Sequence, residues 1–130
     1  MVDTKYTEQV SILVVDDEPS VGDALKLILE SNGYGVTLVA RGTDGVEQAR
    51  DRRFGFAIVD LFLKDICGYR VITDIREHQP EMPILLITSH DDPEVFAKAR
   101  KLGALAVLRK PFSPQQILKL IDSHLRGPTQ

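Results

Sequence analysis

Carboxylates stand at the ends of two apolar runs in this sequence. Asp16 and Asp17 follow the run that ends at Val15, and Asp60 follows Val59 but precedes further apolar residues, so it interrupts an apolar stretch. A buried carboxylate needs partners, and carboxylates brought close together repel one another unless a cation neutralises them. Oxygen ligands of this kind suit Mg²⁺, which binds a few carboxylates together with water and phosphate oxygens. These acids therefore predict a divalent cation site, provided that the fold brings them together.

Two further apolar runs end at residues suited to a phosphoryl group. Thr88 and Ser89 follow the run ILLI, and Lys110 with Pro111 follows the run AVL and Arg109. A lysine ammonium is a point charge that suits phosphoryl oxygens, and a threonine hydroxyl is a neutral donor. Combined with the acids, these residues indicate phosphoryl transfer, with the carboxylate of Asp60 as nucleophile.

Each of these residues also has a simpler interpretation. Asp17 could cap a helix that begins near Pro19, Thr88 could close a local turn, and Lys110 could be a solvated surface charge. The functional interpretation depends on the elements that position the residues.

Those elements alternate between strands and helices. Five apolar runs with little polar alternation predict strands covered on both faces: Val10 to Val15, Gly35 to Val39, Phe56 to Val59, Pro83 to Ile87 and Ala104 to Leu108. Segments with helical periodicity lie between and after them. The predicted fold is α/β, a doubly wound (βα)5 parallel five-stranded sheet in the flavodoxin-like order 2-1-3-4-5, with helices on both faces. The carboxyl ends of its strands, where ligands bind in such folds, would bring the polar residues to one edge.

Helix ends are marked by capping signals. Ser113, Pro114 and Gln116 predict a capping box at the start of the last helix. Asp92 before Pro93 predicts another helix start in the same way.

Composition bounds the protein class. The chain has 130 residues, 43% of them hydrophobic, which fits one domain with its own core. A net charge of -3 with dispersed basic residues argues against a nucleic-acid surface, and one cysteine with three scattered histidines argues against a zinc site. We find neither an apolar run long enough for a membrane span nor a signal peptide, and expect a cytoplasmic protein.

The motifs together resemble the receiver domain of two-component response regulators. The resemblance covers about Val10 to Leu125. It is carried by five motifs in order, namely the acid pair Asp16 and Asp17, the acceptor Asp60, Gly68 eight residues later, the pair Thr88 and Ser89, and the pair Lys110 and Pro111. We expect a tail at residues 1–9, the receiver at 10–126, and a tail or the start of a linker at 127–130.

The resemblance implies a role for each residue. Asp60 would accept a phosphoryl group from a phosphohistidine on a sensor histidine kinase or a histidine phosphotransfer domain. Mg²⁺ would be held by Asp17, Asp60 and the backbone carbonyl of Phe62, with Asp16 acting through a bound water. Lys110, which a cis peptide bond would join to Pro111, would contact the phosphoryl oxygens. Thr88 would move to form a hydrogen bond with the same phosphoryl group. The domain would assist its own phosphorylation and dephosphorylation without being an enzyme.

The same resemblance implies the partners. A phosphorylated receiver would bind an output domain or a downstream protein through the face made by the fourth helix, fifth strand and fifth helix. It would contact neither nucleic acid nor membrane directly.

Two departures from the usual receiver pattern stand out. Receivers usually read like D-x-x-M-P after the acceptor, whereas Leu63 and Lys64 stand here, so we expect a looser loop. Val107 stands where many receivers carry a tyrosine or phenylalanine, which puts in question how the site communicates with the surface.

Two alternatives remain at this point. A haloacid-dehalogenase-type phosphatase also uses an aspartyl nucleophile with Mg²⁺, but it expects a second aspartate where Phe62 stands. A degenerate interaction module that is never phosphorylated would lack the acceptor, the acid pair or the lysine, and none of these is missing.

Overall fold

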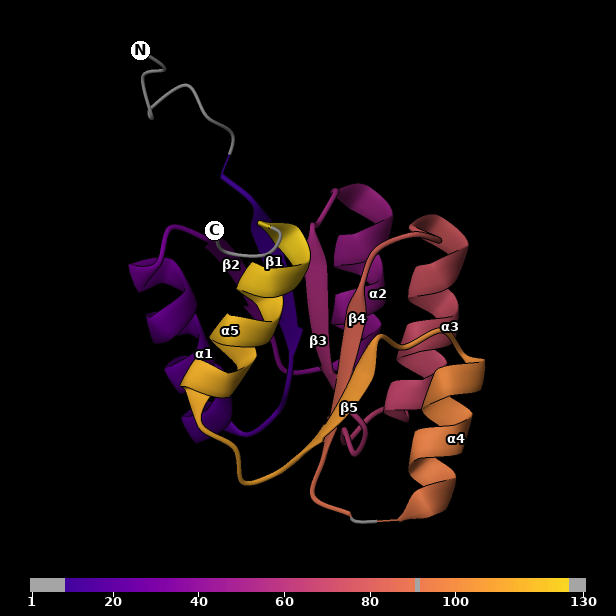
Figure 1. Ribbon diagram of the computed structural model, residues 1–130. Coiled ribbons are helices and arrows are strands. Elements are labelled where there is room, and N and C mark those ends of the chain that lie inside the picture. Colours follow the sequence, from indigo (N-terminus) through magenta and orange to yellow (C-terminus); the bar gives the residue numbers. More distant parts are fainter. Residues whose placement is uncertain (1–8, 91, 127–130) are drawn as a thin grey trace.

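A parallel sheet of five strands forms the centre of the molecule, with a helix after each strand (Figure 1). The computed structural model describes residues 9–90 and 92–126. Its elements in chain order are β1 (Ser11–Val15), α1 (Pro19–Ser31), β2 (Gly35–Val39), α2 (Gly42–Asp51), β3 (Phe56–Asp60), α3 (Gly68–His78), β4 (Ile84–Thr88), α4 (Pro93–Lys101), β5 (Ala106–Arg109) and α5 (Pro114–Leu125). The expected tails lie outside the described residues, apart from Gln9.

The strand order is β2-β1-β3-β4-β5 with every pair parallel, which confirms the predicted fold class. The register aligns the strand ends, because Val15 pairs with Val59 and Asp60 pairs with Ile87. The residues after β1 therefore reach the same edge as the ends of β3 and β4. Only β3 and β4 are buried along their whole length, whereas the edge strands β2 and β5 are half-buried or more exposed.

Helices cover both faces of the sheet (Figure 1). Leu25 and Leu29 of α1 pack with Ile117 and Ile121 of α5 in one apolar cluster. The helices α2, α3 and α4 contribute to a second cluster on the opposite face. Because each buried strand sends alternate side chains to the two clusters, its sequence reads as a continuous apolar run.

The predicted caps of two helices are present. Ser113 and Gln116 form a reciprocal capping box at the start of α5, and Asp92 accepts a hydrogen bond from the amide of Glu94 at the start of α4. The N-cap of α1 is Glu18 without a side-chain bond, so Asp17 does not cap that helix. The simpler interpretation of Asp17 is therefore wrong.

The start of β5 was predicted two residues too early. Ala104 donates its amide to the carbonyl of Ala99 and so belongs to the turn that ends α4. The ladder with β4 begins at Ala106, which pairs with Leu85. Within the part of the chain that the structure describes, none of the helices combines the length and apolar character needed to cross a membrane.

Candidate functional site

The acid pair after β1 lies in two different environments. Asp16 is buried, and its Oδ1 accepts a hydrogen bond of 2.8 Å from the amide of Glu18 at the start of α1. Asp17 is half-buried, and its Oδ2 accepts a bond of 3.1 Å from the amide of Lys64. Each acid thus accepts a hydrogen bond from a backbone amide, Asp16 from the start of α1 and Asp17 from the loop after β3.

Asp60 joins this pair at the end of β3. It is buried, and its Oδ1 accepts a bond of 3.3 Å from the amide of Phe62. One carboxylate oxygen from each of Asp16, Asp17 and Asp60 lies within 4.8 Å of the others. The fold therefore brings together the three acids that the sequence singled out.

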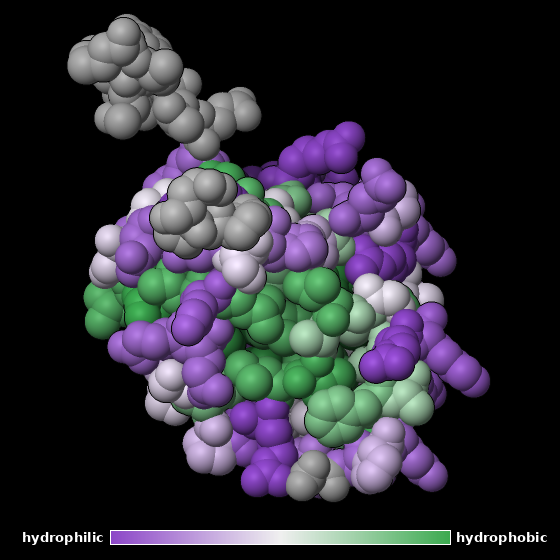
Figure 2. All heavy atoms as spheres, in the orientation of Figure 1, coloured by the Kyte–Doolittle hydropathy of each residue, from purple (hydrophilic) through white to green (hydrophobic). Residues whose placement is uncertain are grey.

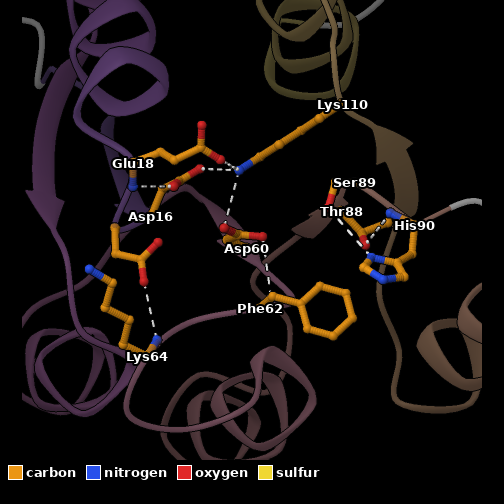
Figure 3. Close-up of polar contacts among 10 residues, drawn as sticks. Asp16, Glu18, Asp60, Phe62, Lys64, Thr88, Ser89, His90 and Lys110 are labelled. Atoms are coloured by element: carbon orange, nitrogen blue, oxygen red, sulfur yellow. Dashed lines mark hydrogen bonds and ion pairs between the residues drawn. The ribbon is translucent and has the colours of Figure 1, made fainter.

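Lys110 reaches into this cluster from the loop after β5 (Figure 3). Its ammonium lies 3.2 Å from Oδ2 of Asp60, 3.3 Å from Oδ2 of Asp16 and 2.8 Å from Oε1 of Glu18. The lysine side chain is only 11% exposed, so the interpretation as a solvated surface charge is wrong. The Lys110–Pro111 peptide bond is cis, as the resemblance implied.

The electrostatics of the cluster favour bound positive charge. Burial raises the pKa of Asp16, and burial together with the charge of Asp16 raises the pKa of Asp60. Burial opposes the charge of Lys110, but the hydrogen bond to Glu18 and the charges of Asp16 and Asp60 raise the pKa of the ammonium above its ordinary value. The lysine remains charged, and one ammonium faces more than one buried carboxylate.

One oxygen in the cluster fits a further cation. Oδ2 of Asp16 is buried, and the ammonium of Lys110 beside it lacks hydrogen-bond geometry, so this oxygen accepts no hydrogen bond among the described residues. A buried oxygen without a donor is costly, and Mg²⁺ binds carboxylate oxygens. The donor set of Asp16, Asp17 and Asp60 therefore fits a divalent cation.

Thr88 lies at the same edge but does not contact the acids. It is buried at the end of β4, and its Oγ1 accepts a bond of 3.1 Å from the amide of His90. This contact agrees with the interpretation of Thr88 as a turn residue (Figure 3). Ser89 interacts with the imidazole of His90 at 3.4 Å.

Phe62 and His90 contact each other beside the acceptor. Their ring centroids are 4.4 Å apart, and the rings are inclined at 45°. Phe62 is partly exposed to solvent, with 51% of its surface accessible.

The loop after the acceptor is tied down without a proline. The carboxylate of Asp65 accepts bonds from the amides of Gly42 at 2.8 Å and Thr43 at 3.0 Å, at the start of α2. The amide of Lys64 bonds Asp17 across the site. Hydrogen bonds therefore connect this segment to α2 and to Asp17, and the expectation of a looser loop stays a prediction.

We expect Asp65→Ala to destabilise the protein at neutral pH by about 1–2 kcal/mol, since it removes the cap of α2. Although burial opposes it, the donors from Thr43 and Gly42 hold the pKa of Asp65 below its ordinary value. The folded state thus binds the proton less tightly than the unfolded state. The stabilisation is present above the ordinary carboxyl pKa and is lost as the pH falls through the lower folded-state pKa.

Urea unfolding of the parent and Asp65→Ala across acid to neutral pH measures this effect. Asp44→Ala, in the first turn of the same helix, is the control. A stability difference that stays constant with pH would contradict a role for the charged form of Asp65.

Gly68 begins α3 where the helix meets the backbone of the acceptor. A Cβ atom there would lie 2.4 Å from the carbonyl oxygen of Asp60 and 2.7 Å from Cα of Leu61. Neither backbone atom can move without displacing the end of β3. The glycine of the motif thus allows α3 to start against the site.

We expect Gly68→Ala to lower the free energy of unfolding by about 1–3 kcal/mol through this overpacking. Gly35→Ala is a matched control, because the closest atom there, at 3.1 Å, is the end of the flexible Gln9 side chain. Chemical denaturation should show a loss for Gly68→Ala well beyond that for Gly35→Ala. Equal losses would mean that the close approach does not limit this position.

Glu18 and Asp65 make contacts at the site that sequence reasoning missed. Glu18 is the nearest carboxylate to the Lys110 ammonium, and Asp65 caps a helix 22 residues earlier in the chain. Glu18 directly follows the acid pair, so a third consecutive acid was its available signal. Asp65 had no local signal, since its partners lie in another element.

Comparisons with known proteins agree with this geometry. Residues 12–122 match the family described as the response regulator receiver domain. The transcriptional regulatory protein FixJ of Bradyrhizobium diazoefficiens is 31% identical over 115 residues, which cover 88% of this chain and 56% of FixJ. The chain spans about half the length of the first curated relatives that it matches.

Solved structures share the fold of this chain. A CheY-like receiver domain protein from Methanospirillum hungatei superposes with a TM-score of 0.87 at 28% identity, covering 92% of this chain and 95% of that one. A response regulator from Burkholderia pseudomallei, solved with a phosphorylated aspartic acid, a calcium ion and citrate, gives a TM-score of 0.79 at 27% identity, covering 93% and 76%.

Proposed function

Because the chain belongs to the response regulator receiver domain family, we propose that it is the phosphoacceptor domain of a two-component phosphorelay. It takes a phosphoryl group from a phosphohistidine onto Asp60, with Mg²⁺, and thereby switches the binding of a partner. One observation carries the proposal. The carboxylate of Asp60 lies 3.2 Å from the Lys110 ammonium and close to the carboxylates of Asp16 and Asp17.

The residues divide the work of the transfer. A carboxylate oxygen of Asp60 attacks phosphorus, the bond from phosphorus to the imidazole nitrogen of the donor breaks, and the electron pair leaves with the imidazole. The ammonium of Lys110, which now contacts carboxylates, would then contact the transferred phosphoryl oxygens. Thr88 would give up its hydrogen bond with the His90 amide and bond the phosphoryl group instead. Asp17, Asp60 and the backbone carbonyl of Phe62 would hold Mg²⁺, with Asp16 acting through a bound water, and the cation would supply positive charge to the phosphoryl oxygens.

The surroundings leave room for a donor side chain. A cavity of about 460 Å³ opens beside the site and is lined by polar Glu18, Ser89 and Lys110 and by apolar residues that include Val21 and Pro111. The solved relative with a phosphorylated aspartic acid supports the acceptor chemistry. We propose a sensor histidine kinase or a histidine phosphotransfer domain as the donor.

The family match favours a signalling module over a haloacid-dehalogenase-type phosphatase, since receiver domains are signalling modules. The output surface is proposed on α4, β5 and α5. Apolar side chains gather in the middle of Figure 2, where Figure 1 shows α5 and β5. Phe96 of α4 and Leu105, which directly precedes β5, are 44% and 43% exposed, so both are available to a partner.

The direct test is phosphorylation by a small phosphodonor. Acetyl phosphate with Mg²⁺ should add the mass of one phosphoryl group to the protein, and EDTA should prevent the addition. A protein that gains no such mass at any Mg²⁺ concentration is the degenerate module instead.

We expect Phe62 to lengthen the lifetime of the phosphorylated form. Hydrolysis of an acyl phosphate requires a water molecule in line with the bond that breaks, and a phenyl ring offers that water no hydrogen bond. Phe62→Asn and Phe62→Glu should shorten the lifetime by roughly three- to tenfold by holding such a water in position. The cation ligand is unchanged, because it is a backbone carbonyl.

The decay rate in excess Mg²⁺, measured by intact mass with His90 left intact, checks this expectation. Phe96→Asn, which replaces an exposed aromatic residue on α4, serves as the control. Lifetimes that are unchanged or longer in both Phe62 variants would remove this residue from the timing of the signal.

A further inference from the structure

A backbone donor contacts the cation site from the loop after the acceptor. The amide of Lys64 lies 3.1 Å from Oδ2 of Asp17, although the two residues are 47 positions apart (Figure 3). Among residues 9–90 and 92–126, Oδ1 of Asp17 accepts no comparable bond. The contact therefore commits one oxygen of this carboxylate and leaves the other available.

The segment that carries this donor is held in place by its next residue. Asp65 fastens to the amides of Gly42 and Thr43 and also accepts a bond of 3.0 Å from the Thr43 hydroxyl. Leu63 and Ile66 pack against the apolar cluster on that face of the sheet. The position of the Lys64 amide is thus set by neighbours that do not belong to the cation site.

A hydrogen bond of this kind orients a ligand. The side chain of Asp17 is only half-buried, so without a partner it would sample several rotamers, and binding a cation would have to restrict them. A carboxylate can accept a hydrogen bond on one oxygen while the other oxygen binds a cation. Every residue type except proline can supply this amide, and the usual receiver pattern places a proline here.

We propose that Lys64 is a positioning residue of the cation site, whose backbone amide holds Oδ2 of Asp17 so that Oδ1 faces the divalent cation. The inference rests on the proposed function, in which Asp17 is a ligand of Mg²⁺. The lysine side chain is exposed and has no part in this role.

The experiment separates the backbone donor from the side chain. Mg²⁺ affinity is measured by calorimetry for the parent, Lys64→Ala and Lys64→Pro, without a phosphodonor. Lys64→Ala keeps the amide and should bind Mg²⁺ as tightly as the parent or slightly more tightly, since a positive charge is lost. Lys64→Pro removes the amide as well and should bind Mg²⁺ roughly three- to tenfold more weakly than Lys64→Ala, the worth of one hydrogen bond.

Equal affinities of Lys64→Pro and Lys64→Ala, or a tighter Lys64→Pro, would overturn the positioning role. A parent that binds no Mg²⁺ would instead overturn the proposed function. If Lys64→Pro does not fold, hydrogen exchange of the Lys64 amide decides, because it should be slower in the metal-free parent than in Asp17→Ala. Identical exchange in these two proteins would overturn the inference.

Discussion

Asp60→Asn should gain no phosphoryl group from acetyl phosphate under conditions that phosphorylate the parent. The amide keeps the shape of the carboxylate but removes the nucleophile, so the expected effect is complete loss rather than a slower rate. The rest of the site should persist, since the amide and the ammonium that bond the Asp60 carboxylate come from Phe62 and Lys110.

Asp74→Asn is the matched control for this loss. It makes the same change on α3, at a carboxylate that pairs with Arg70 instead of facing Lys110. This variant should be phosphorylated like the parent. An Asp60→Asn protein that gains an acid-labile phosphoryl group as fast as the parent would show that the acceptor is a different residue.

Lys110→Ala should separate cation binding from the response to phosphorylation. The ammonium now pairs with Asp16, Asp60 and Glu18, and breaking a buried ion pair costs about 3–5 kcal/mol. The metal-free variant should therefore be less stable than the parent. Mg²⁺ should bind as tightly or more tightly and restore much of the stability, because it replaces the lost positive charge and binds only the folded state.

The phosphorylated variant should lack the structural response. In the parent the lysine would contact the phosphoryl oxygens, so phosphorylation should shift backbone NMR resonances on α4, β5 and α5, and these shifts should be lost in Lys110→Ala. Lys119→Ala, at an exposed position of α5, is the control. A loss of Mg²⁺ affinity by about tenfold, or 1.4 kcal/mol, in Lys110→Ala would assign the lysine a different role.

The sequence predicted the parts of this site that are set by strand ends. Asp16, Asp60, Thr88 and Lys110 each follow or end an apolar run, and parallel strands in register bring such positions to one edge. The capping box of Ser113 was predictable for a similar reason, since its partners lie within one turn of helix.

Sequence reasoning missed contacts between residues that belong to different elements or loops. The amide of Lys64 bonds Asp17, and any residue type except proline could supply this backbone donor. The contact between Phe62 and His90 depends on the relative height of two loops, which the sequence does not specify. Val107 remains a departure from the receiver pattern, half-buried against the cluster that includes residues of α4.

The most direct test of the account is to identify the residue that carries the phosphoryl group. The parent is phosphorylated with acetyl phosphate and Mg²⁺, treated with borohydride, which reduces an aspartyl phosphate to homoserine, and digested for peptide sequencing by mass spectrometry. We predict homoserine at position 60 alone, and none when EDTA is present. Homoserine at position 16 or 17, or modification of position 60 that persists without the cation, would contradict Asp60 as the Mg²⁺-dependent phosphoacceptor.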